Sequence, residues 1–378
     1  MLPSTSSSAS PVLAAVRESD LPTPALVIDA TRVAKNIKRM ADYTAAHRLQ
    51  LRPHTKTHKS RHCARLQLEA GAIGLTVAKA GEAAVFAATG ADILVAYPAL
   101  DPARTRQLAQ LARTTSVRVA VDSRFAIDAL AAAAQAAATE LGILIELDVG
   151  LGRTGVSTAA ESLSLAEHVA RTSGVRLDGI LCYPGHIWAV ANDQASPLEL
   201  VALKLTDAIA LWRKQGLEAR IVSGGSTPTA FQSHLVTAYT EIRPGTYIFN
   251  DLNTVRGGYC TLADCAAAVV CTVVSDAVRD QVVIDGGTKT FTSDFCLPAR
   301  ESGHGFIFEY PEARIARMTE EHGQVDVSRC ERRPRVGERV TVIPNHICPC
   351  VNLHDVIWWG EPDQAPQPMR VDARGKLS

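Results

Sequence analysis

The chain has 378 residues, and its 39 Lys and Arg residues balance its 39 Asp and Glu residues, so the formal net charge at pH 7 is zero. A chain without a cationic excess lacks the charge pattern of a protein that binds nucleic acid or an anionic membrane, so we expect a small-molecule substrate. Nowhere do 18 apolar residues follow one another, and no basic segment leads into an apolar one at the start of the chain, so we expect neither a membrane span nor a signal peptide.

In the first two thirds of the chain, two kinds of segment alternate after a short leader. A Ser-rich segment at residues 1–19 is predicted to be a flexible leader. After it, apolar runs alternate with Ala- and Leu-rich stretches long enough to form helices. The predicted strands are residues 24–29, 51–54, 73–77, 93–97, 117–121, 143–148, 179–183 and 221–224, and the predicted helices include 31–48, 81–88, 102–112, 124–138 and 198–215. Eight strands alternating with helices favour parallel pairing, so we predict an α/β fold in which residues 20–252 form a (β/α)8 TIM-like barrel.

Beyond residue 252 the sequence changes to β-branched runs without Ala-rich stretches between them. Such runs at residues 268–275, 281–284 and 338–343 predict a mostly β C-terminal domain over residues 253–378. Residues 313–337 are expected to be rich in loops, with the polar segments 319–323 and 331–334 as solvated turns. The nine cysteines are odd in number and irregularly spaced, which favours a reducing, cytoplasmic location over a disulfide scaffold.

Lys56 is the first candidate for a catalytic residue. It lies among histidines and other cations in residues 51–59, directly after a predicted strand. Positive neighbours favour the neutral amine that Schiff-base chemistry requires. The alternative is a solvated basic loop. The active face of a barrel lies at the carboxyl ends of its strands, where Lys56, Asp148 and Tyr183 are all expected, and this position favours the catalytic interpretation.

Two further segments follow predicted strands of the barrel. In residues 223–229, Gly225, Ser226 and Thr227 offer backbone N–H groups and hydroxyls to an anion, and the loops after the late strands of a barrel are the usual phosphate site. The alternative is an ordinary turn. Residues 150–155 match the G-x-G-x-x-G spacing, but Asp178 precedes an apolar run instead of ending a strand, so we reject a dinucleotide site. Arg153 is placed to meet a ring nitrogen or an anion, the alternative being a surface arginine.

A pair of candidate metal ligands lies near the C-terminus. His346 and Cys348 follow the strand that ends at Ile343, and their side chains point the same way if the strand period persists. Imidazole with thiolate suits zinc and leaves positions open for water or substrate. The alternative is a strand-end histidine beside a buried cysteine. Residues 352–355 lie close enough in sequence to support such a site.

Taken in order, several segments resemble the D-threonine aldolase and D-serine dehydratase family of fold-type III pyridoxal-phosphate enzymes. They are residues 23–29, 52–59, 148–155, 224–229, 241–247, 344–348 and 352–355, so the resemblance runs from about residue 20 to residue 360. It implies an alanine-racemase-like barrel followed by a β domain, with pyridoxal phosphate and a divalent metal as cofactors and a homodimer as the assembly. Zinc is the favoured metal, because Cys348 is a soft ligand, and manganese is the alternative.

The resemblance also implies roles for individual residues. Lys56 is the Schiff-base lysine and Arg153 lies near the pyridine nitrogen. Gly225, Ser226 and Thr227 hold the phosphate, and His346 with Cys348 binds the metal. The remaining cofactor-binding positions are His54, Tyr183, Gly224 and Tyr247.

The family includes two reactions on β-hydroxy-D-amino acids. In the dehydratase route Lys56 removes the Cα proton and the hydroxyl leaves, giving an oxo acid and ammonia. In the aldolase route a base deprotonates the hydroxyl and the Cα–Cβ bond breaks, giving glycine and an aldehyde. The aldolases resembled here carry His-x-Asp at the metal motif and a histidine six residues after the tyrosine, where this chain has Cys348 and Ala189. Both departures favour a D-serine dehydratase-like enzyme.

A D-threonine aldolase-like activity remains the alternative, because His186 could supply the base for the hydroxyl from a new position. We therefore take Lys56, Tyr183 and His186 as the catalytic candidates. A racemase would need a second acid or base facing the other side of Cα. A non-catalytic pyridoxal-phosphate-binding protein and a metal hydrolase without that cofactor are more remote alternatives.

Overall fold

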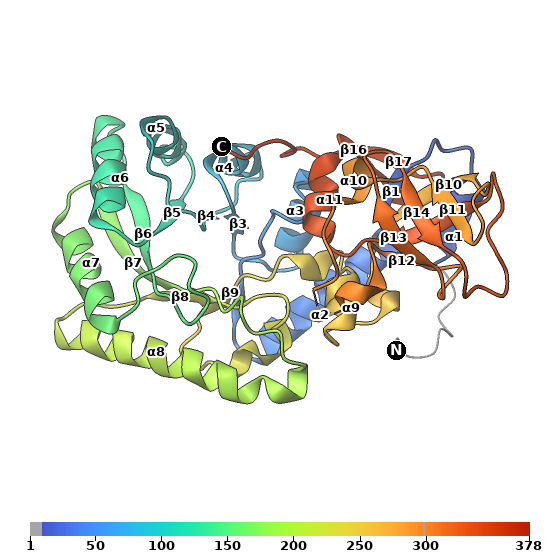
Figure 1. Cartoon of the computed structure of the whole chain (residues 1–378). Helices are drawn as coiled ribbons and strands as arrows, with labels where there is room; N and C mark the ends of the chain where they lie inside the picture. The colour runs from blue at the N-terminus through green and yellow to red at the C-terminus, as the bar shows by residue number, and fades with distance from the viewer. Residues whose placement is uncertain (1–9, 298) are drawn as a thin grey trace. The chain divides into compact units, whose positions relative to one another are not determined.

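The computed structural model of the chain describes residues 10–297 and 299–378. These residues form two compact units (Figure 1). We call the first the barrel unit; it contains residues 38–56, 60–245 and 375–378. We call the second the β unit; its described residues are 10–37, 57–59 and 246–374, apart from residue 298.

The barrel unit is built on eight parallel strands. They are β2 (Gln50–Leu51), β3 (Leu75–Val77), β4 (Ile93–Val95), β5 (Val117–Val121), β6 (Leu141–Glu146), β7 (Val175–Leu181), β8 (Ile221–Gly224) and β9 (Glu241–Ile242), hydrogen-bonded in the order β2-β9-β8-β7-β6-β5-β4-β3. The chain after β2 joins the two ends of this sheet, because Thr76 N donates to Pro53 O at 2.9 Å and Thr55 N donates to Thr76 O at 2.8 Å. The predicted α/β barrel is therefore confirmed.

Helices lie outside the ring of strands (Figure 1). They are α3 (Arg61–Glu69), α4 (Ala80–Ala87), α5 (Pro102–Leu111), α6 (Arg124–Ala136), α7 (Ala159–Arg171) and α8 (Ala195–Lys214), while α2 (Ala30–Ala46) runs from the β unit into the barrel unit. Four of them begin at a side chain that accepts a hydrogen bond from the first turn, namely Ser60, Asp101, Ser123 and Thr158. Every residue of β6 is buried, as expected for a parallel strand covered on both faces.

The β unit is built on a nine-stranded sheet. Its main path is β13-β14-β11-β10-β1-β16-β17, and β15 joins it by pairing with β10 and β12. The strands are β1 (Ala25–Asp29), β10 (Ala267–Ser275), β11 (Gln281–Ile284), β12 (Phe306–Ile307), β13 (Arg314–Met318), β14 (Gly323–Asp326), β15 (Arg339–Ile343), β16 (Val356–Gly360) and β17 (Gln367–Arg370). Short helices complete it: α1 (Pro11–Glu18), α9 (Leu252–Arg256), α10 (Thr288–Phe291) and α11 (Ile347–Leu353).

The prediction that residues 24–29 form the first barrel strand is wrong. β1 pairs antiparallel with β10, with Ala25 opposite Val270, and parallel with β16. A fully buried apolar strand has the same sequence pattern in either sheet, so the pattern could not distinguish them. The eighth barrel strand is β9, whose two residues are too few to give a pattern. Lys56 therefore follows the first strand of the barrel, and Ser226 follows the seventh.

Two other segments differ from expectation. Residues 1–9 of the predicted leader lie outside the described residues, but residues 11–18 form α1, which begins after the capping side chain of Ser10 and buries Val12, Leu13 and Val16. The segment 313–337, predicted to be rich in loops, contains the antiparallel pair β13 and β14. No helix among the described residues is both long enough and apolar enough to cross a membrane.

Candidate active site

Three predicted site residues meet at the carboxyl ends of the barrel strands. Lys56 follows β2, Arg153 follows β6 and Tyr183 follows β7. Both of the other side chains lie over the ring of Tyr183. Lys56 Nζ is 5.9 Å and Arg153 Cζ is 4.7 Å from the centre of that ring. The aromatic face is electron-rich and so attracts both cations. The arrangement places an amine and a guanidinium beside one aromatic ring.

The loop that carries Arg153 is closed at its base. Leu147 and Val156 form a parallel β-bridge, and Asp148 Oδ1 accepts from the backbone N–H groups of Gly150 at 3.1 Å and Gly152 at 3.0 Å. Burial raises the pKa of Asp148, but these N–H groups more than offset the effect and bring the pKa below its usual value. The glycine spacing thus serves a closed loop, and α7 begins only at Ala159. A dinucleotide fingerprint would instead open a helix directly.

His186 lies against the same loop. A Cβ atom added to Gly150, which has φ +132°, would come within 2.9 Å of His186 Nε2. Position 150 therefore needs glycine both for its backbone conformation and for the close approach of the imidazole. The structure thus brings His186, on the loop after β7, beside the loop that carries Arg153.

The predicted phosphate loop follows β8. Gly224 packs on Tyr239, whose ring a Cβ at position 224 would meet at 2.1 Å, and Gly225 has φ +78°. A left-handed residue in a turn directs successive N–H groups to one side, which suits an oxyanion. Ser226 is buried, and its Oγ lies 3.0 Å from Thr229 Oγ1. The residues from Gly225 to Thr227 therefore fit a phosphate group. His54 has a local role, since its Nδ1 accepts from Lys56 N at 3.4 Å.

The metal pair forms in the β unit, but not by strand geometry as predicted. β15 ends at Ile343 and α11 begins at Ile347 with His346 at its N-cap position, so the strand period does not persist. The side chains of His346 and Cys348 nevertheless meet in a hydrogen bond. Burial lowers the pKa of His346, but this bond and the charges of Cys348 and Asp251 outweigh burial and raise the pKa to about 9. The imidazole of His346 and the sulfur of Cys348 are therefore in direct contact.

Residues distant in sequence hold this pair. Asp294 Oδ2 lies 3.0 Å from His346 Nδ1, so the other ring nitrogen, Nε2, is the one that would face a metal. Thr57 Oγ1 lies 3.1 Å from Cys348 Sγ, and Thr246 Oγ1 lies 3.5 Å from it. Tyr247 follows Thr246 in the short helix Thr246–Ile248 and is buried. The sequence interpretation missed Asp294 and Thr57, because nothing in a local pattern links them to residues 346–348.

Two of the residues predicted to support the metal pair, His354 and Asp355, bond to other groups. His354 Nε2 lies 3.2 Å from Thr290 O, and Asp355 pairs with Arg374 at 2.8 Å. Within residues 10–297 and 299–378, no three His, Cys, Asp or Glu side chains are grouped so as to hold a metal ion. The pair His346 and Cys348 would therefore bind a divalent ion with two protein ligands, and imidazole with thiolate fits zinc.

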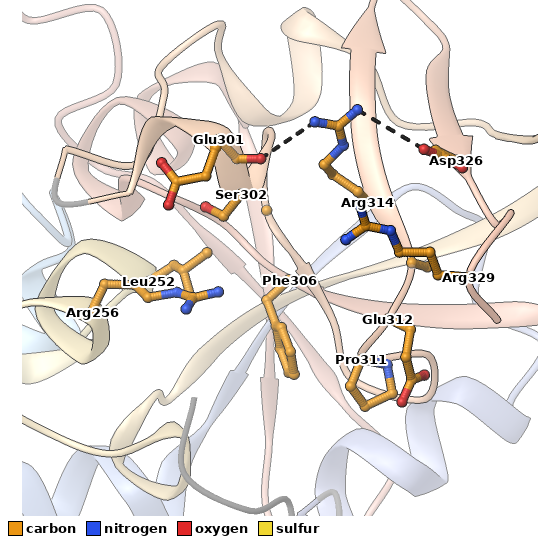
Figure 2. A pocket seen from close by; sticks show the side chains of 12 residues that line it. Leu252, Arg256, Glu301, Ser302, Phe306, Pro311, Glu312, Arg314, Asp326 and Arg329 are labelled. Carbon is orange, nitrogen blue, oxygen red and sulfur yellow. Dashed lines mark hydrogen bonds and ion pairs between the residues drawn. The ribbon is translucent and has the colours of Figure 1, made fainter. Parts of the chain in front are cut away.

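A hollow of about 430 Å³ in the β unit contains none of the predicted site residues. Figure 2 shows Arg256 and Arg314 among its lining residues, with Arg314 donating to Glu301 O at 3.4 Å and pairing with Asp326 at 3.9 Å. Its charged lining residues are Arg256, Arg314, Arg329, Glu301, Glu312 and Asp326. Three arginines thus face three carboxylates. Because no predicted site residue lines this hollow, we do not place the site there.

Comparison with known proteins agrees with the fold and identifies the family. A family model described as the N-terminal domain of alanine racemase matches residues 28–252, and one described as a putative serine dehydratase domain matches residues 266–359. A 3-hydroxy-D-aspartate aldolase of Paracoccus denitrificans (strain Pd 1222) is 30% identical over 378 residues, which cover 97% of this chain and 95% of that relative.

Two solved structures are similar over nearly the whole chain. A D-threonine aldolase from Filomicrobium marinum has a TM-score of 0.87 and 28% identity, covering 95% of this chain and 97% of its own. A metal-free D-threo-3-hydroxyaspartate dehydratase with one cysteine changed to alanine has a TM-score of 0.85 and 30% identity, covering 93% of this chain and 97% of its own. With the barrel, the Lys56–Tyr183–Arg153 cluster and both family models in agreement, the chain belongs to the fold-type III enzymes, as a pyridoxal-phosphate-dependent lyase of the D-threonine aldolase and D-serine dehydratase family.

Proposed function

We propose that this lyase acts on β-hydroxy-D-amino acids with pyridoxal phosphate and a divalent metal, and that it dehydrates them to an oxo acid and ammonia. The observation that carries the proposal is the meeting of His346 and Cys348. These two residues form a His-x-Cys pair, which resembles the metal motif of the dehydratases and differs from the His-x-Asp of the aldolases. Relatives of this chain include both dehydratases and aldolases, so the distinction between the two reactions depends on residues of this chain.

The barrel unit supplies the groups for pyridoxal phosphate. When bound, this cofactor provides an electron sink for negative charge that develops at Cα. Gly225, Ser226 and Thr227 would hold the phosphate, and Arg153 would face the pyridine nitrogen, where a guanidinium disfavours protonation of the ring. Lys56 would bind the cofactor and take the Cα proton. The shared ring of Tyr183 keeps Lys56 and Arg153 in one region of the barrel mouth.

The β unit supplies the groups for the metal. A divalent ion would act as a Lewis acid toward the β-oxygen of the substrate. His346 and Cys348 would hold it, Asp294 would orient His346, and Thr57 would orient the sulfur of Cys348. Thr57 directly follows Lys56 in the chain. Zinc suits the soft sulfur ligand best, and manganese is the alternative.

The aldolase reaction is the second candidate, and a specific observation supports it. Retro-aldol cleavage needs a base for the β-hydroxyl, and the position that carries a histidine in the aldolases resembled here is Ala189. His186 could take this role, because it lies at the barrel mouth against Gly150. Dehydration breaks the Cβ–O bond and leaves the Cα–Cβ bond intact, so it does not need a base for the β-hydroxyl and remains the preferred reaction.

The experiment is a product assay with and without a chelator. The protein, loaded with pyridoxal phosphate and zinc, is incubated with D-serine, D-threonine and D-threo-3-hydroxyaspartate. Oxo acid and ammonia in equal amounts, lost on chelation, would support the dehydratase. Glycine and an aldehyde without ammonia would contradict it and establish the aldolase. No turnover of any of the three, with the cofactor bound, would contradict both.

The proposal extends to assembly and location. We propose that the protein is a homodimer in the cytoplasm. Light scattering of the purified holoenzyme tests the dimer, since a mass of one chain, 40.4 kDa, would contradict it.

A further inference from the structure

Glu146 is a buried carboxylate that the proposed reaction does not use. It is the last residue of β6, its exposed fraction is 5%, and it stands at the base of the loop that carries Arg153. Burial raises the pKa of Glu146, an effect that Thr154, Arg243 and Arg153 only partly offset. A buried carboxylate is costly, so its partners indicate what it stabilises.

The partner with a hydrogen bond to this carboxylate is Thr154, the residue that directly follows Arg153. Thr154 Oγ1 donates to Glu146 Oε1 at 2.8 Å. The next residue, Gly155, donates its backbone N–H to Asp122 Oδ2 at 3.0 Å. Two carboxylates at the ends of neighbouring strands therefore hold the two residues on the C-terminal side of Arg153.

Charge connects Glu146 with Arg153 more directly. Arg153 lies close enough to lower the pKa of Glu146, and Glu146, Arg153, Thr154 and Tyr183 line one small hollow. The charged and titratable groups that face Glu146 are Asp122, Arg153, Cys182 and Arg243. Glu146 is therefore a carboxylate close to Arg153, although Arg243 lowers the pKa of Glu146 more than Arg153 does.

A competing explanation is that Glu146 serves Arg243 alone. Arg243 is buried, and it donates to Ser223 Oγ at 2.8 Å and to Cys182 O at 2.9 Å. It also feels the charge of Glu241. Arg243 therefore has partners of its own, whereas the hydrogen bond of Glu146 goes to the Arg153 loop.

We infer that Glu146 is a positioning residue for Arg153: through Thr154 it fixes the loop, and through its charge it sets how strongly the guanidinium acts on the ring nitrogen of bound pyridoxal phosphate. The inference rests on the proposed role of Arg153. Without the carboxylate, Arg153 would act as an uncompensated positive charge, and nearby positive charge favours the deprotonated form of any group beside it.

The test uses the visible absorption band of pyridoxal phosphate bound to the full-length protein. Glu146→Gln should move the pH midpoint of this band downward by about half a unit or more, as expected for removal of a neighbouring negative charge. Thr154→Val keeps the carboxylate but removes its bond to the loop, and should weaken pyridoxal phosphate binding about threefold to tenfold. Thr154→Ser retains the hydroxyl and should restore the wild-type dissociation constant.

Glu140→Gln is the matched control, because Glu140 precedes the same strand and pairs with Arg176 at 2.6 Å on the surface. It should leave both quantities unchanged. The inference is overturned if Glu146→Gln keeps the wild-type midpoint, if Glu140→Gln moves it equally, or if Thr154→Val binds the cofactor as wild type does, since Glu146 would then serve Arg243 alone. Absence of any visible band in the wild-type protein would instead refute the proposed function.

Discussion

The two clusters of functional residues are held in different ways. In the barrel unit, Lys56, Arg153 and Tyr183 each follow a strand of one sheet, so the regular order of parallel strands brings them together. In the β unit, His346 and Cys348 lie at the start of a short helix, and residues up to about 290 positions away hold them, namely Thr57, Asp251 and Asp294.

This difference separates what the scaffold determines from what individual contacts determine. A strand end keeps its position as long as the barrel folds, so the strands place the barrel cluster, and Glu146 with Thr154 then adjusts Arg153 within it. The metal pair depends on a few hydrogen bonds, and loss of any one should loosen it. The predictions below test this contrast.

The largest effect is expected from Lys56→Ala. Removal of the amine abolishes both the attachment of pyridoxal phosphate and the base for the Cα proton, and we expect activity to fall by at least about 10³-fold. The visible absorption band of the bound cofactor should disappear with it. Lys38→Ala, which removes an exposed lysine paired with Asp42 at 2.7 Å, is the control and should keep both. A band that survives in the Lys56 variant would contradict the assignment of this residue.

The next effect concerns the metal. Cys348→Ala removes one of two protein ligands, so we expect the metal affinity to fall by at least about 100-fold and zinc to be lost on dialysis. Metal content per chain, measured by atomic emission, checks this. Cys350→Ala changes a buried cysteine of the same helix, whose Sγ lies 3.2 Å from Thr290 O, and should retain the metal. Equal metal loss in both variants would show that the helix, and not the Cys348 sulfur, determines binding.

A smaller effect is expected from Asp294→Asn. The variant weakens the bond that orients His346 without removing a ligand, and such changes cost about 10-fold to 100-fold in metal affinity. Competition with a chromogenic chelator measures the change. Asp355→Asn alters the residue that local sequence favoured as a support, and should leave the affinity unchanged. If Asp355→Asn weakens binding more than Asp294→Asn, the long-range account of this cluster is wrong.

The smallest effect is expected from Thr158→Ala in the barrel. Thr158 and Glu161 form a capping box at the start of α7. The variant should lower the free energy of unfolding by about 1 kcal/mol, measured as a shift of the urea midpoint. The cofactor band and the product ratio should not change, because strand ends and not the helix start place the barrel cluster. A changed product ratio would argue against that independence.

The sequence was most informative where chemistry and regular structure coincide. The position of Lys56 after an apolar run, and of Ser226 after another, follows from local pattern together with the geometry of parallel strands. The pattern could not identify the sheet to which residues 25–29 belong, because a strand buried on both faces gives no alternation. It also could not find β9, since two residues carry no period.

At the candidate metal site, the sequence predicted the residue types but not the local structure or the distant partners. The residue types at positions 346 and 348 predicted a metal-binding pair, and the structure brings this imidazole and this thiol together. The reason given, a continuing strand, was wrong, because the chain turns into α11 after Ile343. Asp294 and Thr57 could not be found, since their distance from this pair along the chain leaves no local signal. An alignment of related sequences, read for paired changes at 294 and 346, is the kind of signal that could reveal them.

The position of β1 in the sheet also determines when this strand can pair during synthesis. Ala25 leaves the ribosome early, yet its antiparallel partner Val270 is made 245 residues later. At about 5–20 residues per second, this delay is roughly 12–50 s. During that time β1, whose five residues are all buried in the finished sheet, has neither of its neighbouring strands. The nascent chain must therefore keep an apolar segment from aggregating while the whole barrel is being made, and this interval is when chaperone binding would matter most.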